Sequence, residues 1–189
     1  MALPHAILVS LCEQAGSGYE LARRFDRSIG YFWGATHQQI YRTLRAMENK
    51  DWVRATTVAQ HGRPDKRVYT VSGNGREELA RWIAEPLRPT RPGRGSALSD
   101  DGTRDIAVKL RGAAYGDIAA VRAQVDALRA ERAASLDTYR GLQRRSFPDP
   151  SGLRDAALHQ YLVLRGGIRA EESAIAWLDE VGRALPETP

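Results

Sequence analysis

Apolar residues recur at helical spacing in four stretches of residues 1–86, with two β-rich stretches before the last of them. Residues 3–14 are apolar on nearly every side, which predicts a helix that is buried on more than one face. The other three helical stretches each begin with a serine or threonine that can cap a helix. The pattern predicts three helices, a β-hairpin and a fourth helix that ends at Pro86.

Two helix starts match the capping box, in which Ser or Thr is followed three residues later by Glu or Gln. Ser17 and Glu20 form the first box, and Thr36 and Gln39 form the second. These boxes predict where the second and third helices begin. In the second helix we expect the inward positions to be Tyr19, Leu21, Ala22 and Phe25.

The third predicted helix is amphipathic. Its apolar positions, Ile40, Leu44 and Met47, fall on one side of a helical wheel. The opposite side carries two long cations and two amides, namely Gln38, Arg42, Arg45 and Asn49. This face is typical of a helix that offers hydrogen-bonding groups to a partner.

The two β-rich stretches flank a turn that contains Gly62 and Pro64, which predicts a hairpin. Three cations lie at or beside its tip: Arg63, Lys66 and Arg67. The predicted order is three helices, a hairpin and a fourth helix, with a tight turn before the polar-faced third helix. This is the order of a winged helix-turn-helix domain. We expect this domain over residues 1–86.

The second half of the chain predicts a helical domain behind a linker. Residues 87–103 are rich in Pro, Gly and Arg, which is typical of a linker. Gly166 and Gly167, inside the last predicted helix, either kink it or allow another helix to approach closely. Apolar spacing predicts helices over residues 104–110, 116–145 and 153–185.

These C-terminal helices are apolar on one face and too long to bury that face by themselves. We therefore expect residues 104–189 to form an α-helical dimerisation domain and the chain to be a homodimer. The fold class is then mainly α with a small β-hairpin. An N-terminal winged helix-turn-helix domain precedes the C-terminal helical domain.

The charge of the 189-residue chain is +5 and is unevenly divided. Residues 1–95 hold 15 Lys and Arg against 9 Asp and Glu, and the remainder holds 13 against 14. A basic first half is expected if that half meets a polyanion such as nucleic acid. Chance asymmetry in an arginine-rich sequence produces the same count, so charge alone does not identify the partner.

The sequence argues against a membrane protein, a secreted protein and an enzyme. The longest apolar stretch, residues 6–12, is too short to span a membrane and lacks the flanks of a signal peptide. Cys12, the single cysteine, favours a small buried residue in the reducing cytoplasm. The four histidines lie far apart, so we expect no cofactor, no metal and no catalytic residue.

Three motifs follow one another in the first half of the chain. Residues 40–48 read I-Y-R-T-L-R-A-M-E, residues 63–72 read R-P-D-K-R-V-Y-T-V-S, and residues 75–79 read G-R-E-E-L. They resemble the recognition helix, the wing and the following helix of the PadR family of bacterial transcription regulators, with Met47 where leucine is usual. The helical tail is similar to the longer PadR subgroup, whose C-terminal helices build the dimer.

The resemblance implies a homodimeric repressor that binds double-stranded DNA, with the third helix in the major groove. Gln38 and Arg42 are our candidates for base readout, because an amide pairs bidentately with adenine and a guanidinium with guanine. Two-fold pairing places two such helices about one DNA turn apart, which implies an imperfect palindromic operator.

Four other residues of this helix are candidate contacts, each with a structural alternative. Gln39 either caps the helix or contacts a base. Thr36 caps the helix and touches a phosphate through the helix N-terminus. Tyr41 contacts a phosphate or packs against the wing, and Arg45 contacts a phosphate or is simply solvated.

The wing adds three candidates. Arg63, Lys66 and Arg67 are placed to contact the minor groove or the phosphates beside it. An exposed hairpin tip is also often charged for solubility alone, so both interpretations stay open.

The resemblance also implies an effector, because the family commonly responds to small aromatic or amphipathic compounds. A crevice between the winged domain and the dimerisation helices would hold it. The aromatic walls would be tryptophans, although core packing is the role we expect for each: Trp33, Trp52, Trp82 and Trp177. We therefore assign no ligand-binding residue.

Two other functions remain open. A winged-helix regulator of another family, such as the multiple-antibiotic-resistance type, has long helices on both sides of the winged domain, whereas here they all follow it. A protein-interaction or adaptor module does not need Gln38, Arg42 and Arg45 together with a cationic wing tip.

Overall fold

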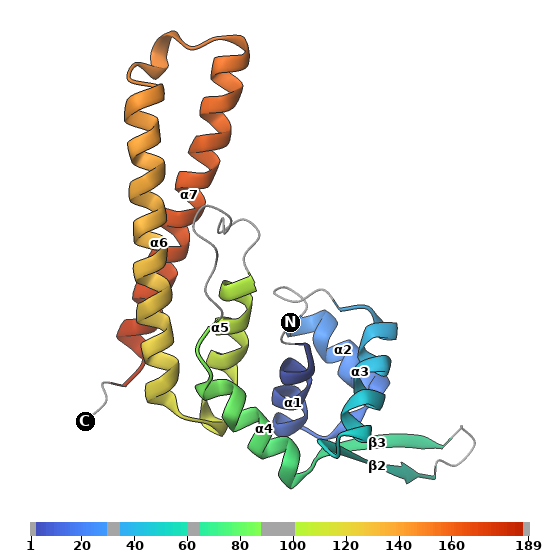
Figure 1. Ribbon diagram of the computed structural model, residues 1–189. Helices are drawn as coiled ribbons and strands as arrows, with labels where there is room; N and C mark the ends of the chain where they lie inside the picture. Colours follow the sequence, from blue (N-terminus) through green and yellow to red (C-terminus); the bar gives the residue numbers. More distant parts are fainter. Residues whose placement is uncertain (1–2, 30–34, 60–64, 88–100, 187–189) are drawn as a thin grey trace. The chain divides into compact units, whose positions relative to one another are not determined.

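The computed structural model describes residues 3–29, 35–59, 65–87 and 101–186 of the chain, which divides into two compact units. The first unit comprises Met1–Pro86 with Arg104–Val121, and the second comprises Leu87–Thr103 with Arg122–Pro189. Helices account for most of both units, as the predicted mainly α fold class requires (Figure 1).

Four helices of the first unit lie where the apolar spacing predicts them. α1 spans Leu3–Glu13, α2 Gly18–Arg24, α3 His37–Asn49 and α4 Gly73–Ala84. α2 continues as a π-helical turn, η1, over Phe25–Ile29. Every residue of α1 from Ala6 to Leu11 is buried, which confirms that this helix is enclosed on more than one side. Since α1 contacts α2, α3 and α4, it forms the centre of the unit.

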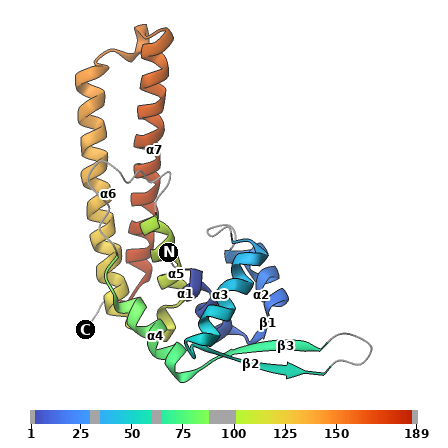
Figure 2. The same ribbon diagram turned by 45° about the vertical axis from the view of Figure 1, so that its right-hand side comes forward.

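The strands of this unit form one antiparallel sheet in the order β1-β3-β2. β1 spans Gly16–Ser17, β2 Val53–Val58 and β3 Lys66–Val71. β2 and β3 are the predicted hairpin, with Val53 opposite Val71, and Figure 2 shows this wing projecting beyond the helices. β1 is absent from the sequence prediction, because two residues carry no alternating pattern and only their pairing with β3 defines the strand.

Both predicted capping boxes are present. The Ser17 hydroxyl accepts from the backbone N–H of Glu20 at 3.3 Å, and the Glu20 carboxylate accepts from the backbone N–H of Ser17 at 2.8 Å. Thr36 and Gln39 make the same reciprocal pair at the start of α3. These caps satisfy backbone donors that a helix start otherwise leaves without partners.

Ser72 and Gly75 join the wing to α4. The Ser72 hydroxyl accepts from the backbone N–H of Gly75 at 3.0 Å and donates to the carbonyl of Asp51. A Cβ at position 75 would lie 2.0 Å from the Trp52 carbonyl oxygen. Only glycine therefore fits this position, which gives a structural reason for the first residue of the G-R-E-E-L motif.

α5, which spans Asp101–Arg111, packs within the first unit although it follows the predicted linker. Its Lys109 ammonium donates to the Glu85 carbonyl and lies 5.0 Å from the centre of the Trp82 ring. The Arg111 guanidinium pairs with Glu13 of α1 at 2.7 Å. Because of these contacts, the chain passes from the first unit to the second at Val121 and Arg122. This is later in the sequence than the predicted boundary between residues 103 and 104.

The predicted linker differs from the structure at one end. Asp101 to Thr103 begin α5, so the helix starts three residues before the position 104 that the apolar spacing indicated. Residues 88–100 lie outside the described residues, so the rest of the predicted linker is not tested. A single-turn helix, η2 (Ala113–Tyr115), leads from α5 to α6.

The second unit is a hairpin of two long antiparallel helices (Figure 1). α6 spans Ile118–Ser146, a short turn η3 spans Pro150–Gly152, and α7 spans Asp155–Ala184. Surface ion pairs join the helices, and a further pair is fully buried between Arg132 and Glu171. The buried apolar residues of α6 and α7 include Val121, Val125, Leu128, Leu136, Ile168 and Leu178.

The two glycines of α7 do not interrupt the helix, which runs without a break from Asp155 to Ala184. Gly167 faces Tyr139 of α6, and a Cβ at position 167 would lie 3.4 Å from the Tyr139 ring. Of the two predicted alternatives, the contact supports close approach of a neighbouring helix.

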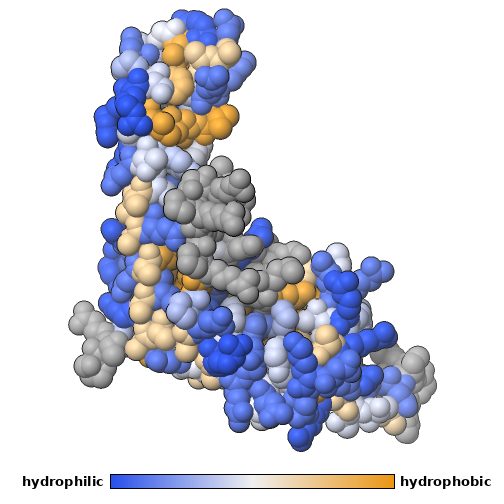
Figure 3. All heavy atoms as spheres, viewed as in Figure 1, coloured by the Kyte–Doolittle hydropathy of each residue, from blue (hydrophilic) through white to orange (hydrophobic). Residues whose placement is uncertain are grey.

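The hairpin leaves large apolar side chains open to solvent. Val163 is 77% exposed, Leu162 55% and Leu142 39%. Figure 3 shows apolar surface near the end of the hairpin at which α6 leads to α7. Two helices alone cannot cover such a surface, because each can bury only one stripe against the other.

Candidate nucleic-acid interface

α3 presents two faces of opposite character. Ile40, Leu44 and Met47 are buried in the first unit and hold the helix in place. The residues on the other side are exposed, and they include five of the sequence candidates: Gln38, Gln39, Tyr41, Arg42 and Arg45. The structure therefore brings these five side chains together on one surface.

Gln38, Arg42 and Arg45 have no hydrogen-bond or ion-pair partner among the described residues. Their amide and guanidinium groups thus point to water in the free protein. Guanidinium groups remain charged at every physiological pH, so Arg42 and Arg45 give this face a permanent positive charge.

Thr36 and Gln39 act as caps in the structure. The Thr36 hydroxyl accepts from the backbone N–H of Gln39 at 3.2 Å, and the Gln39 side-chain oxygen accepts from the backbone N–H of Thr36 at 2.9 Å. The oxygen of Gln39 is therefore occupied, while its amide nitrogen stays exposed. A base contact by Gln39 would have to use that nitrogen.

Tyr41 packs against α2. A Cβ on Gly18 would lie 2.4 Å from the Tyr41 ring, so the ring rests on the backbone at the first residue of α2. The Tyr41 side chain nevertheless remains 43% exposed. Gly18 therefore allows α2 and α3 to pack closely at this point, a role that the sequence did not reveal.

A hollow of about 620 Å³ lies between α2, α3 and the wing. We call it the interface hollow. Sequence reasoning placed Tyr41, Arg45, Lys66 and Arg67 near DNA, and all four line it. The other lining residues include Tyr19 and Arg23, which sequence reasoning did not assign to this surface.

The prediction that Tyr19 points inward is wrong. Its side chain is 57% exposed, and the Arg23 guanidinium lies 5.9 Å from the centre of its ring. An aromatic at the second position of a short helix resembles a core residue in a hydropathy pattern. The available signal was the spacing of four between Tyr19 and Arg23, which puts both on one face of α2.

The wing cations are paired within the protein. The Lys66 ammonium lies 2.6 Å from the Glu20 carboxylate, and the Arg67 guanidinium lies 2.5 Å from that of Glu48. The hydrogen bond from Lys66, with the cap at Ser17, lowers the pKa of Glu20 to about 2. Arg63, the third wing candidate, lies outside the described residues.

The partners of the wing cations are far from them in sequence. Glu20 precedes Lys66 by 46 positions, and Glu48 precedes Arg67 by 19. Only the fold brings each carboxylate to its cation. Around the interface hollow, the charge that is available without breaking an ion pair therefore lies on Arg45 of α3 and Arg23 of α2, rather than on β3.

Other kinds of site are not indicated. Among the described residues, no group of three or more His, Cys, Asp and Glu side chains is arranged to hold a metal ion. No helix in the described ranges is long and apolar enough to cross a membrane. Three helices packed together, an exposed polar face on α3, a wing and a closing helix define a winged helix-turn-helix protein.

Comparison with known families agrees with this class. Residues 7–81 match the model of the transcriptional regulator PadR-like family, and residues 104–185 match the virulence activator alpha C-terminal family. A probable transcriptional regulator of Mycobacterium tuberculosis is 81% identical over 187 residues, which cover 99% of each chain. The chain belongs to the PadR-like family of transcriptional regulators.

More distant relatives match over nearly their whole length. The negative transcriptional regulator PadR of Bacillus subtilis is 24% identical over 95% of this chain and 94% of its own. Its crystal structure with operator DNA covers 98% of this chain and 100% of that chain at 22% identity, with a TM-score of 0.45. The Vibrio cholerae virulence activator AphA covers 97% of both chains at 29% identity, with a TM-score of 0.41.

The family assignment removes one of the two alternatives that the sequence left open. Its members are transcriptional regulators and not enzymes, as the sequence predicted. The regulator of a different winged-helix family is excluded as an interpretation, because the match to the PadR-like model covers most of the winged unit.

Proposed function

We propose that the protein is a homodimeric repressor that acts in the cytoplasm and binds an imperfect palindromic operator through α3. The observation that carries this proposal is the exposed face of α3, where Gln38, Arg42 and Arg45 have no partner among the described residues. Long polar side chains that bond nothing in the protein are available to base edges and phosphates.

The roles within α3 follow from position and chemistry. Gln38 and Arg42 lie toward the N-terminal half of the helix, the part of a recognition helix that reaches base edges. Gln38 would pair with adenine and Arg42 with guanine. Arg45 and Tyr41 would contact phosphates, as would the backbone amides beside Thr36.

In this proposal the wing contacts DNA after an exchange of partners. Lys66 leaves Glu20 and Arg67 leaves Glu48, and each cation then binds a phosphate. An exposed ion pair contributes about 0.2–1 kcal/mol, and a charge-assisted contact to phosphate offsets that loss. Arg63 is assigned to the same surface from its position in the sequence.

The exposed apolar surface of the α6–α7 hairpin supports a second copy of the chain as its partner. Leu142, Leu162 and Val163 would be covered in the dimer. We expect a dimer at about micromolar concentration by analytical ultracentrifugation, and a monomer for the double variant Leu162→Glu, Val163→Glu. A monomeric wild-type chain would contradict the proposal.

We also propose release by a small aromatic or amphipathic effector. Bacillus subtilis PadR has been crystallised with p-coumaric acid, which has this chemistry. Trp82 is not a candidate wall for such a ligand, because it is buried and stacks on His5 at 4.3 Å between ring centres. Loss of a DNA complex on addition of p-coumaric acid or a related compound would identify the class.

A gel shift with the DNA upstream of the protein's own gene, followed by footprinting, tests the proposed function. We expect a shifted complex and a protected imperfect palindrome. The affinity should fall steeply with salt, because phosphate contacts release counterions. Absence of any complex at low salt would leave the protein-interaction module as the better interpretation.

A further inference from the structure

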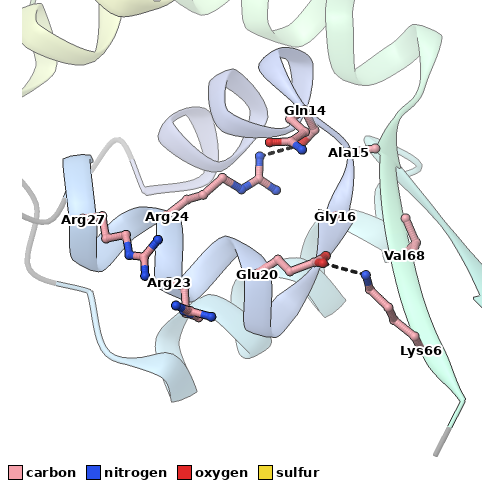
Figure 4. A pocket seen from close by; sticks show the side chains of 9 residues that line it. All are labelled: Gln14, Ala15, Gly16, Glu20, Arg23, Arg24, Arg27, Lys66 and Val68. Atoms are coloured by element: carbon pink, nitrogen blue, oxygen red, sulfur yellow. Dashed lines mark hydrogen bonds and ion pairs between the residues drawn. The ribbon is translucent and has the colours of Figure 1, made fainter. Parts of the chain in front are cut away.

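A second hollow has four cations among its nine lining residues, and it shares Glu20, Arg23 and Lys66 with the interface hollow. Its volume is about 450 Å³, and it lies between α2, the turn after α1 and the start of β3. Its charged lining consists of Glu20, Arg23, Arg24, Arg27 and Lys66 (Figure 4). We call this hollow the α2 basic pocket.

Glu20, the carboxylate of this pocket, is already bonded to groups of the protein. It accepts from Lys66 at 2.6 Å and from the backbone N–H of Ser17 at 2.8 Å. These two bonds hold its pKa near 2, so it is ionised at physiological pH and neutralises Lys66. The guanidinium groups of Arg23 and Arg27 then remain for the rest of the pocket.

Arg24 is anchored by the backbone. Its guanidinium donates to the carbonyls of Ser10 at 2.8 Å and Gln14 at 2.6 Å, at the end of α1 (Figure 4). The group lies directly over Gly16, where a Cβ would come within 2.5 Å of its Nη2. A glycine in β1 thus allows one guanidinium to form the floor of the pocket.

Arg23 and Arg27 carry charge that no carboxylate of the described residues neutralises. They lie four positions apart, Arg23 in α2 and Arg27 in the π-helical turn η1 that continues it, and two like charges this close repel each other. The nearest acid in sequence, Asp26, is directed instead to His37 at 3.5 Å. An anion between the two guanidinium groups would remove this repulsion.

We propose that the α2 basic pocket binds a small anion that carries two or more phosphate groups. Guanidinium groups bind phosphate oxygens bidentately, and those of Arg23 and Arg27 line a hollow large enough for a phosphorylated small molecule. The DNA backbone offers the same chemistry. It is the less favoured source, because Gln38, Arg42 and Arg45 do not line this pocket.

The pocket is connected to the wing through Lys66, the first residue of β3. A bound anion would compete with Glu20 for that ammonium and lower the positive charge of the wing. We therefore expect the anion to weaken DNA binding. This coupling, but not the binding site itself, rests on the proposed function.

Isothermal titration of the full-length chain with pyrophosphate, at ionic strength held constant with sodium chloride, tests the site without DNA. We expect saturable binding that Arg27→Gln weakens at least tenfold. Arg27 is the best position to change because it lines the α2 basic pocket and not the interface hollow. The matched control is Arg76→Gln, an exposed arginine of α4, which should leave the affinity within about twofold.

The outcomes separate the possible sources of phosphate. Absence of saturable pyrophosphate binding, or equal binding by both variants, overturns the proposal. If Arg27→Gln instead weakens DNA binding and pyrophosphate does not bind, the pocket serves the DNA backbone and the proposal is again wrong. Saturable binding in a chain that failed to bind any DNA would support the pocket while contradicting the proposed function.

Discussion

α3 and the wing each contribute two described cations to the proposed DNA surface, and they hold them differently. Arg42 and Arg45 on α3 have no partner among the described residues, whereas Lys66 and Arg67 on β3 each hold a carboxylate. A count of basic residues treats the four as equal. The structure shows that the charge present on a surface and the charge ready to meet a phosphate are different quantities.

The difference also separates two kinds of contribution to recognition. A guanidinium without a partner binds DNA without first breaking an ion pair, so its contact adds directly to affinity. A paired cation first gives up its partner, so its net contribution is smaller. We therefore expect α3 to dominate affinity and the wing to adjust it.

The largest expected effect is that of Arg42→Ala. Loss of a bidentate contact to guanine should cost about 1–3 kcal/mol on the specific operator and less on unrelated DNA. Fluorescence anisotropy with both DNAs measures the two values. An equal loss of affinity for both DNAs would indicate that Arg42 contacts phosphates. It would contradict the proposal that Arg42 reads a base.

Glu20→Gln should have two opposite effects. The Gln side chain can still accept from Ser17, but the start of α2 loses its negative charge, so the free energy of unfolding should fall by about 0.3–1 kcal/mol. Release of Lys66 should raise DNA affinity by about two- to fivefold. Urea denaturation and anisotropy measure them. Glu48→Gln is the matched control, because it releases Arg67 without touching a cap; it should raise DNA affinity and leave stability nearly unchanged.

The salt dependence of binding should distinguish the two regions. Arg45→Ala removes one phosphate contact per subunit, so the log–log slope of the dimer should become shallower by about 1.8. Lys66→Ala should change the slope less, because Glu20 already neutralises part of that charge in the free protein. Equal changes would indicate that the wing ion pairs do not persist in solution.

The smallest expected effect is a pH dependence of stability. The pKa of Glu20 is lowered from 4.5 to about 2, chiefly by the hydrogen bond from Lys66. Because the folded-state pKa is the lower one, the stabilisation is present above pH 4.5 and disappears as the pH falls toward 2. The stability difference between wild type and Glu20→Gln should therefore shrink over this range, and a constant difference would contradict it.

The elements that sequence reasoning predicted correctly are those with a local signal. The capping boxes at Ser17 and Thr36 mark two helix starts, and apolar spacing marks the buried faces. Both signals act within one or two helical turns. They do not depend on where the rest of the chain lies, which is why a sequence alone carries them.

The features that sequence reasoning missed depend on contacts between distant positions. β1 exists because Gly16 pairs with Tyr69, and the wing cations are paired because the fold brings Glu20 and Glu48 to them. The exposure of Tyr19 likewise follows from the packing of α2 against α3. Neither β1 nor the two ion pairs leave a periodic signature in the sequence.

The position of α5 has a practical consequence for dissecting the protein. A fragment that stops at Pro86 keeps every proposed DNA contact and removes the segment whose Gly112 lies against Val9 and whose Gly116 lies against Ile83. Such a fragment would expose the inner sides of α1 and α4 to water. The smallest DNA-binding piece suited to NMR would be a discontinuous one, residues 1–86 rejoined to residues 104–121 by a short flexible bridge.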